Sequence, residues 1–187
     1  MRIISGKFKG KKIILPKDKL TRPLKDLTKE SIFNIINHSH EIKIEIDKSN
    51  ILDLFSGTGS FGLECLSRGA KSVIFIENYK NILPILKKNI NNLRFEKNSK
   101  IFEEDIFDKN SLKFLDLRFD IIFVDPPFKE QKLFELVEKI VKNEILKKNG
   151  VLIIHRHKKN QDILPKKLKI LQEKTYGISK VIFSNII

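Results

Sequence analysis

The sequence predicts an α/β protein in which a mostly parallel sheet carries helices on both faces. Three observations indicate this fold class. From residue 50 onward, short apolar runs typical of buried strands alternate with segments of helical periodicity. A glycine-rich turn follows the first of these strands, and a carboxylate follows the second. The chain has 187 residues, which is enough for one domain of this kind with a full core.

The segment before residue 50 is expected to form a small extension. Residues 2–15 resemble a basic hairpin that turns at Ser5-Gly6 and ends at Pro16. A helix follows, and its predicted apolar face comprises Leu24, Leu27, Ile32, Ile35 and Ile36. Residues 37–49 fit two interpretations, because their alternating isoleucines suit a strand whereas the charges between them suit a surface loop.

The remaining elements follow the order strand, helix, strand. Apolar runs predict strands at 51–54, 72–76, 100–102, 120–124, 150–154, 168–175 and 178–185. Helical spacing of apolar side chains predicts helices at 60–68, around 82–90 and at 131–142. The last two strands turn at Tyr176-Gly177, so they are expected to pair as neighbours.

Charge and cysteine content limit the possible partners. The formal net charge of +14 suggests a polyanion, most simply nucleic acid, although a lysine-rich composition is an alternative cause. Cys65 is the single cysteine, which excludes an intramolecular disulfide and a cysteine metal cluster.

No apolar run approaches the roughly 20 residues of a membrane span, and the basic start lacks a signal peptide's apolar stretch. We therefore expect a cytoplasmic monomer without a membrane partner.

The glycine-rich turn predicts a nucleoside cofactor. Gly57, Gly59 and Gly62 form a G-x-G-x-x-G pattern, and Glu77 at the end of the next strand can bind ribose hydroxyls. A dinucleotide site fits the same glycines, but Asp53 would repel its pyrophosphate. Asp53 instead suits the α-amino group of S-adenosylmethionine. The expected cofactor-binding residues are Asp53, Phe55, Gly57, Gly59, Gly62, Glu77 and Asp105.

Asp105 belongs to an acidic run, 103–105, that follows the third short strand of this core. A carboxylate at this position can accept a hydrogen bond from an adenine amino group. The alternative is that the run is a solvated acidic loop.

Asp125-Pro126-Pro127-Phe128 predicts methyl transfer to a planar amine. An exocyclic base amine is a poor nucleophile, so it must be held in line with the methyl group. The Asp125 carboxylate and the Pro126 carbonyl supply acceptors, while the two prolines make the loop rigid. Phe128 offers a stacking face for a base turned out of its helix. A structural Asp-Pro turn with a core phenylalanine is the alternative.

Two further groups of side chains carry weaker signals. His38 with His40, and His155 with His157, lack the acidic or cysteine neighbours of typical metal sites, so we expect solvated or substrate-side histidines and no metal. The basic start is expected to contact RNA phosphates, although a solvated face is the alternative. The predicted RNA-binding residues are Arg2, Lys7, Lys9, Lys11, Lys12 and Arg22.

These motifs together resemble the RsmD family, bacterial methyltransferases that act on a guanine N2 of 16S ribosomal RNA. The likeness covers nearly the whole chain. It includes the opening hairpin, Arg22-Pro23 with the helix that follows, and the segments 53–64 and 125–128. Leu24 and Lys29 depart from the usual family pattern of Thr and Arg.

The resemblance implies a Rossmann-like class I methyltransferase with a seven-stranded, mostly parallel sheet whose last strand is antiparallel. It implies one domain, 1–187, with an N-terminal RNA-binding extension over 1–40 and an S-adenosylmethionine-binding catalytic core over 50–187. The implied substrate is 16S rRNA, in the small ribosomal subunit or its assembly intermediate. A DNA adenine-N6 methyltransferase and a non-catalytic RNA-binding assembly protein are the rival interpretations.

Overall fold

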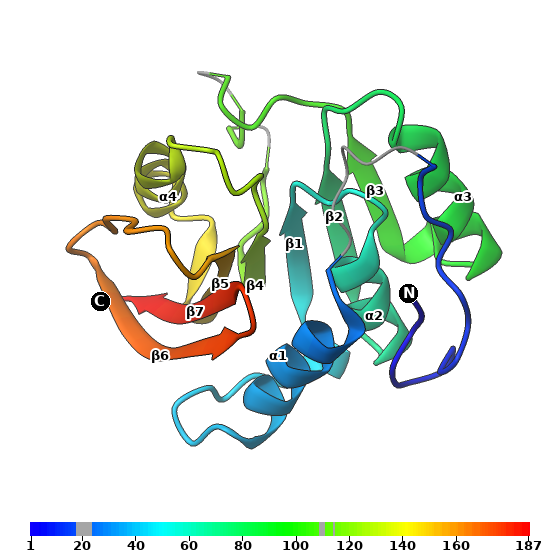
Figure 1. The fold of residues 1–187 in the computed structure, drawn as a ribbon, viewed down its shortest axis with the longest axis horizontal. Coiled ribbons are helices and arrows are strands. Elements are labelled where there is room, and N and C mark those ends of the chain that lie inside the picture. The colour runs from blue at the N-terminus through cyan, green and yellow to red at the C-terminus, as the bar shows by residue number, and fades with distance from the viewer. Residues whose placement is uncertain (18–23, 109–110, 114) are drawn as a thin grey trace.

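The computed structural model describes residues 1–17, 24–108, 111–113 and 115–187, and within them the chain forms one seven-stranded sheet (Figure 1). The strand order is β3-β2-β1-β4-β5-β7-β6. The strands are β1 Asn50–Leu54, β2 Ser72–Ile76, β3 Ser99–Phe102, β4 Phe119–Val124, β5 Leu146–His157, β6 Leu168–Tyr176 and β7 Ser179–Ile186. Strands β1 to β5 run parallel, whereas β7 runs antiparallel to both β5 and β6, which confirms the predicted sheet.

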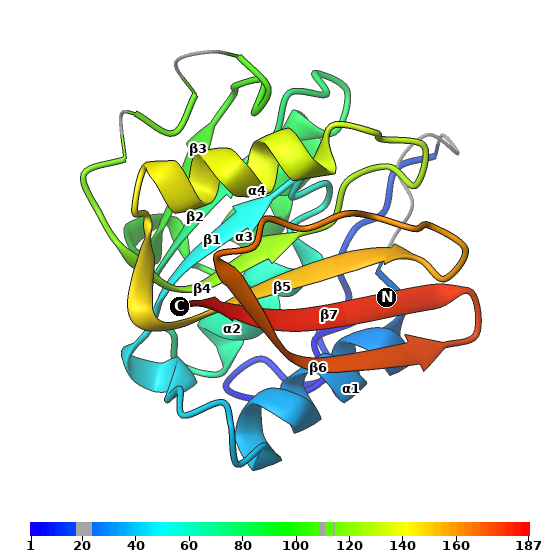
Figure 2. The same cartoon turned by 90° about the vertical axis from the view of Figure 1, so that its left-hand side faces the viewer.

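Helices cover both faces of the sheet, as Figure 2 shows. Helix α4 lies on one face, and α1, α2 and α3 lie on the other. The α-helices are α1 Asp26–His38, α2 Ser60–Ser67, α3 Leu83–Asn92 and α4 Leu133–Lys142, with short 3₁₀ helices η1 Ile46–Lys48 and η2 Glu96–Asn98. Each face buries its own apolar cluster.

A column of phenylalanine rings attaches α1 and α2 to the sheet. Phe33 of α1 stacks on Phe61 of α2 with ring centroids 5.3 Å apart, and Phe61 stacks on Phe123 of β4 at 4.1 Å. Stacked aromatic pairs of this kind stabilise a core by about 0.5–1.5 kcal/mol beyond their buried area. The column ends two residues before Asp125, so it fixes the end of the strand from which the predicted catalytic loop starts.

The strand order reverses at β1, which positions the site. Strand β1 pairs with β2 on one side and with β4 on the other, in register at Ile51↔Val73 and Ile51↔Ile121. The turns that follow β1 and β4 therefore leave the sheet side by side. Open parallel sheets bind ligands at such a reversal, outside the carboxyl ends of the strands.

The N-terminal segment forms the predicted hairpin, and this hairpin packs on the core. Its two halves are joined by the antiparallel bridge Arg2↔Lys12 and by backbone hydrogen bonds from Gly10 to Ile3, from Ile3 to Lys11 and from Ile13 to Met1, at 2.9, 2.9 and 3.2 Å. Ile3 and Ile13 are buried, and the backbone N–H groups of Ile4 and Ser5 donate to the Glu64 carboxylate at 2.7 and 2.9 Å. Hydrogen bonds to α2 thus hold the backbone of Ile4 and Ser5 in place.

Two other predictions about elements require correction, and one open choice is decided. Leu27 is 70% exposed and does not belong to the apolar face of α1, which Phe33 completes instead. Of the two interpretations of residues 37–49, the structure shows the loop: α1 continues to His38, and 39–49 form a loop that contains η1, with Ile42 and Ile46 buried. Strand β5 begins at Leu146 rather than at Gly150, because pairing with β4 continues across a register shift.

Candidate active site

The turn after β1 has the backbone conformation that its glycines allow. Gly57 and Gly59 have φ angles of +54° and +82°, in the left-handed region that glycine enters most easily. Phe55 shares that region at φ +59°, which is uncommon for a residue with a side chain. The Ser56 hydroxyl donates to the carbonyls of Asp53 and Ile76 at 2.7 and 3.1 Å, so the turn is bonded to both strands.

Gly62 lets α2 pack closely on the sheet. It lies inside α2, and a Cβ atom added there would come within 2.3 Å of the Phe75 ring on β2. Only a residue without a side chain lets α2 pack this closely on the sheet. The sequence pattern placed Gly62 among the cofactor-binding residues, and the structure adds this role in packing α2 on β2.

Asp53 is a buried carboxylate at the carboxyl half of β1. It is 1% exposed, and its Oδ2 accepts a hydrogen bond from the backbone N–H of Gly62 at 3.0 Å. Burial raises the pKa of Asp53 well above its usual range, and the negative charges of Asp125 and Glu77 add to this effect. A cationic ligand group beside Asp53 would offset this cost, so the residue fits the amino-acid end of S-adenosylmethionine.

Glu77 bonds to the glycine turn from the end of β2. Its Oε2 accepts from the Gly57 N–H at 2.7 Å, and its Oε1 accepts from the Asn78 and Tyr79 N–H groups at 3.0 and 2.9 Å. A carboxylate has about four acceptor positions, so three of them are already used. The one left, on Oε2, fits a ribose hydroxyl.

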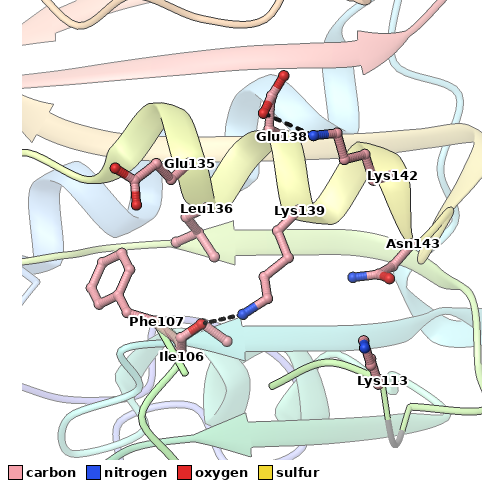
Figure 3. Close-up of a pocket in the computed structure, with 9 residues that line it drawn as sticks. All are labelled: Ile106, Phe107, Lys113, Glu135, Leu136, Glu138, Lys139, Lys142 and Asn143. Carbon is pink, nitrogen blue, oxygen red and sulfur yellow. Dashed lines mark hydrogen bonds and ion pairs between the residues drawn. The ribbon is translucent and has the colours of Figure 1, made fainter. Parts of the chain in front are cut away.

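Asp105 lies on an exposed segment, and the residues after it, Ile106 and Phe107, lie beside Leu136 and Lys139 of α4 (Figure 3). Its Oδ1 accepts a hydrogen bond from the Phe107 N–H at 2.9 Å. The Lys139 ammonium donates to the Ile106 carbonyl at 3.2 Å, to the Ser111 hydroxyl at 2.6 Å and to the Asp108 carbonyl. Burial lowers the pKa of Lys139. Lys139 therefore links α4 to the segment after β3 by hydrogen bonds.

The Asp125–Phe128 loop is built from the end of β4 and is held by the end of β5. Asp125 Oδ1 lies 2.7 Å from Nδ1 of His155, and the Asp125 side chain is 21% exposed. The Phe128 ring meets the edges of His155 and His157 at centroid distances of 5.7 and 5.1 Å. The carboxylate and the aromatic ring predicted from the sequence thus both contact His155, and the ring also contacts His157.

Arg156 fastens this loop from the other face of β5. It is 1% exposed, and its guanidinium binds both carboxylate oxygens of Asp162 at 2.8 and 2.9 Å. It also donates to the carbonyls of Pro127 and Glu130 at 3.1 and 2.7 Å. Bidentate pairing of this kind is strong and directional, so it makes the proline loop rigid.

The sequence did not reveal the roles of His155, Arg156 and Asp162. Solvated or substrate-side histidines were expected, yet His155 is only 4% exposed. The available signal was the continuous apolar run 151–154 immediately before it, which predicts a buried strand that extends into these polar residues. A buried strand that ends in polar residues beside a catalytic loop is a reason to examine those residues.

The predicted RNA-binding cations are exposed but separated into two places. Arg2, Lys7, Lys9, Lys11 and Lys12 are all exposed. The Arg2 carbonyl accepts from Lys29, which also bonds Ser60 at the start of α2. Lys7 instead donates its backbone N–H to Ser67 at the opposite end of α2. Arg22 lies outside the described residues.

Comparisons with known proteins agree with this arrangement. A family model described as "Conserved hypothetical protein 95" matches residues 1–185. The ribosomal RNA small subunit methyltransferase D of Haemophilus influenzae is 33% identical over 184 residues, covering 95% of this chain and 90% of that protein. The chain belongs to the RsmD family. The Escherichia coli protein of the same name is 29% identical over 181 residues, with 95% and 85% covered.

A solved structure supports the same fold. The structure titled "Putative methyltransferase yhhF from Escherichia coli" has a TM-score of 0.80 and 26% identity, and the match covers 100% of this chain and 97% of that one. The chain is accordingly a class I methyltransferase with a Rossmann-like fold, and its methyl donor is S-adenosylmethionine. Among the described residues, no helix is long and apolar enough to cross a membrane, and no group of three metal-ligating side chains is present.

Proposed function

We propose that this RsmD-family protein methylates the exocyclic N2 amine of a guanine in 16S rRNA, within the small subunit or an assembly intermediate. The observation that carries the proposal is the position of the Asp125 carboxylate. It directly follows β4, lies beside the glycine turn, and belongs to the same short loop as the Phe128 ring. The Haemophilus influenzae and Escherichia coli relatives, both named as small-subunit rRNA methyltransferases, support the substrate class. The net charge of +14 suits a polyanionic partner.

In this proposal the two carboxylates of β1 and β2 hold the cofactor. Asp53 faces its cationic amino-acid end, and Glu77 takes a ribose hydroxyl on Oε2, the oxygen that also accepts the Gly57 N–H. Asp105 accepts from the adenine amino group. S-adenosylmethionine supplies an electrophilic methyl group on a sulfonium. The protein's task is therefore to position the amine rather than to activate the methyl group.

Asp125 and the proline loop position that amine. One carboxylate oxygen is bonded to His155, while Oδ2 has no partner among the described residues and accepts an amine proton. The Pro126 carbonyl is the second acceptor, and Phe128 stacks on the turned-out base. The amine nitrogen then forms a bond to the methyl carbon as the carbon–sulfur bond breaks. The proton leaves the methylated amine afterwards.

The proposal can be tested by nucleoside mass spectrometry. Purified protein and cofactor are incubated separately with 16S rRNA, small-subunit particles and duplex DNA, and an Asp125→Ala protein serves as the matched control. We expect N2-methylguanosine in the ribosomal substrates from the wild-type protein only. N6-methyladenine in DNA would favour the rival enzyme class, and no product in any substrate would favour a binding protein.

A further inference from the structure

A buried histidine lies directly behind the predicted catalytic carboxylate. Strands β4 and β5 are parallel and paired at Val124↔Ile154, so Asp125 and His155 are the next residues along each strand. The His155 side chain is 5% exposed, and its Nδ1 lies 2.7 Å from Asp125 Oδ1. Strand β7 covers the other edge of β5 and pairs Val181 with His155. The imidazole therefore has little freedom to move away from the carboxylate.

The contact defines which nitrogen carries the proton. A carboxylate accepts hydrogen bonds, so a nitrogen at 2.7 Å from it must be the donor. Nε2 of His155 is buried and has no hydrogen-bond partner among the described residues. If the proton were on Nε2 alone, a buried N–H donor would have no acceptor, which costs free energy. The Nδ1 lone pair would then also point at the carboxylate, and the two would repel each other. The geometry thus favours the Nδ1–H tautomer.

We propose that His155 is a positioning residue for methyl transfer. This inference rests on the proposed function. By donating from Nδ1 to Oδ1, His155 holds the Asp125 carboxylate in one rotamer, so Oδ2 presents its lone pairs to the target amine. The same imidazole meets the Phe128 ring edge-on at 5.7 Å. One side chain thereby sets the relative position of the amine acceptor and the stacking face.

Three substitutions separate this role from simple packing. In His155→Asn the amide nitrogen takes nearly the place of Nδ1, so the donor is kept. In His155→Gln the amide nitrogen lies nearer the place of Nε2, and His155→Leu removes every donor while filling similar volume. We expect kcat to fall by about 10–100-fold in the Gln and Leu variants, the range typical of lost orienting partners. The Asn variant should retain most of the wild-type kcat.

Three further measurements show whether the effect passes through Asp125 and spares the cofactor site. Calorimetry with S-adenosylhomocysteine should give wild-type affinity for all three variants, because among the described residues the side-chain hydrogen bond of His155 goes to Asp125 and not to the glycine turn. In an Asp125→Ala background, His155→Leu should cause no further loss of kcat. Spectra of ¹⁵N-histidine protein should show a low-field Nδ1–H proton that disappears in Asp125→Ala.

Defined outcomes would overturn the inference. A wild-type kcat in both the Gln and Leu variants would show that Asp125 needs no positioning partner. Equal losses of kcat in the wild-type and Asp125→Ala backgrounds would show that His155 acts independently of Asp125. If the wild-type protein methylates none of the RNAs, the proposed function itself fails, and its failure is recognised by the inactive wild type rather than by the variants.

Discussion

Asp125 is placed to orient an amine and is not required to act as a strong base. The sulfonium leaving group makes methyl transfer favourable before the proton departs. Losing one preorganised acceptor costs about 10²–10³-fold in rate at comparable electrostatic sites. We therefore expect Asp125→Ala to lower single-turnover rates by about that factor at saturating cofactor, and Asp125→Asn to retain part of the activity. A wild-type rate for Asp125→Ala would make the motif a structural turn.

Glu77 has two tasks that one substitution would remove together. It bonds the Gly57, Asn78 and Tyr79 N–H groups, and we propose that it also takes a ribose hydroxyl. Hydrogen bonds to a charged group contribute about 1.5–3 kcal/mol each. Glu77→Ala should weaken S-adenosylhomocysteine binding by about 2–4 kcal/mol in calorimetry. Glu103→Ala is the matched control, because Glu103 forms an exposed ion pair with Lys87. Unchanged affinity in Glu77→Ala would refute the assignment.

Asp53 should make folding stability depend on pH. Burial raises its pKa in the folded protein, whereas the unfolded chain has a pKa of about 3.9. Between these two values the folded state binds more protons than the unfolded state, so the free energy of unfolding falls as pH rises. Urea titrations of wild type and Asp53→Asn between pH 4 and 8 isolate this effect. The stability of wild type relative to the variant should decrease with pH, and a constant difference would contradict the prediction.

At the residue scale, the carboxylates of the site were predictable because they lie at the carboxyl ends of predicted strands. Asp53, Glu77 and Asp125 were predicted at one edge of the sheet because carboxyl ends of parallel strands meet there, and the structure places them there. The His155 and Arg156 contacts were not predictable in this way. They depend on which side chains of β5 face the loop after β4, and that follows from register rather than from composition.

At the element scale, the proline loop depends on the buried guanidinium of Arg156. Arg156→Lys keeps the charge, but an ammonium cannot reproduce a planar fork that binds Asp162 and two carbonyls. We expect a loss of about 1–3 kcal/mol in the free energy of unfolding, together with a lower kcat. Arg118→Lys is the matched control, since the Arg118–Glu144 ion pair is exposed and should contribute under about 1 kcal/mol. Equal effects in the two variants would contradict this role.

Elements with a strong local signal were predicted well, and those fixed by tertiary contacts were not. The strands at 51–54, 72–76 and 120–124 agree with β1, β2 and β4 within one residue. The turn signals of the N-terminal segment predicted its hairpin, but they did not predict that the N–H groups of Ile4 and Ser5 would bond the Glu64 carboxylate of α2. Leu27 satisfies helical spacing, but it is exposed, whereas Phe33 of α1 packs on Phe61 of α2.

At the scale of the whole molecule, the basic N-terminal segment cannot be treated as a removable arm. Lys29 and Glu64 are both 0% exposed and lie 3.7 Å apart, with Arg68 at 2.8 Å from the same carboxylate. Removing residues 1–15 would leave Glu64 without the N–H groups of Ile4 and Ser5, which is costly for a buried charge. Charge reversal at exposed positions therefore tests RNA binding more cleanly than deletion.

Four basic residues of the N-terminal segment form two pairs, one near each end of α2. Arg2 and Lys12 are bridged near the start of α2, beside the glycine turn, while Lys7 and Lys9 lie near its other end, roughly 10 Å away. Because α2 starts directly after the glycine turn beside Asp125, we expect the phosphates next to a base held at Asp125 to lie closest to the first pair. Reversing Arg2 and Lys12 to Glu should thus flatten the salt dependence of RNA affinity more than reversing Lys7 and Lys9.

The measurement is the slope of log affinity for an rRNA fragment against log salt concentration. Each lost phosphate contact should reduce that slope by about 0.7 for single-stranded RNA. S-adenosylhomocysteine affinity and the thermal midpoint serve as folding controls, because all four side chains are exposed. If neither double variant changes the slope, the positive charge of this segment reflects the lysine-rich composition of the chain and not RNA binding. If only the Lys7 and Lys9 variant does, the RNA crosses the far end of α2, and the proposed approach to Asp125 is wrong.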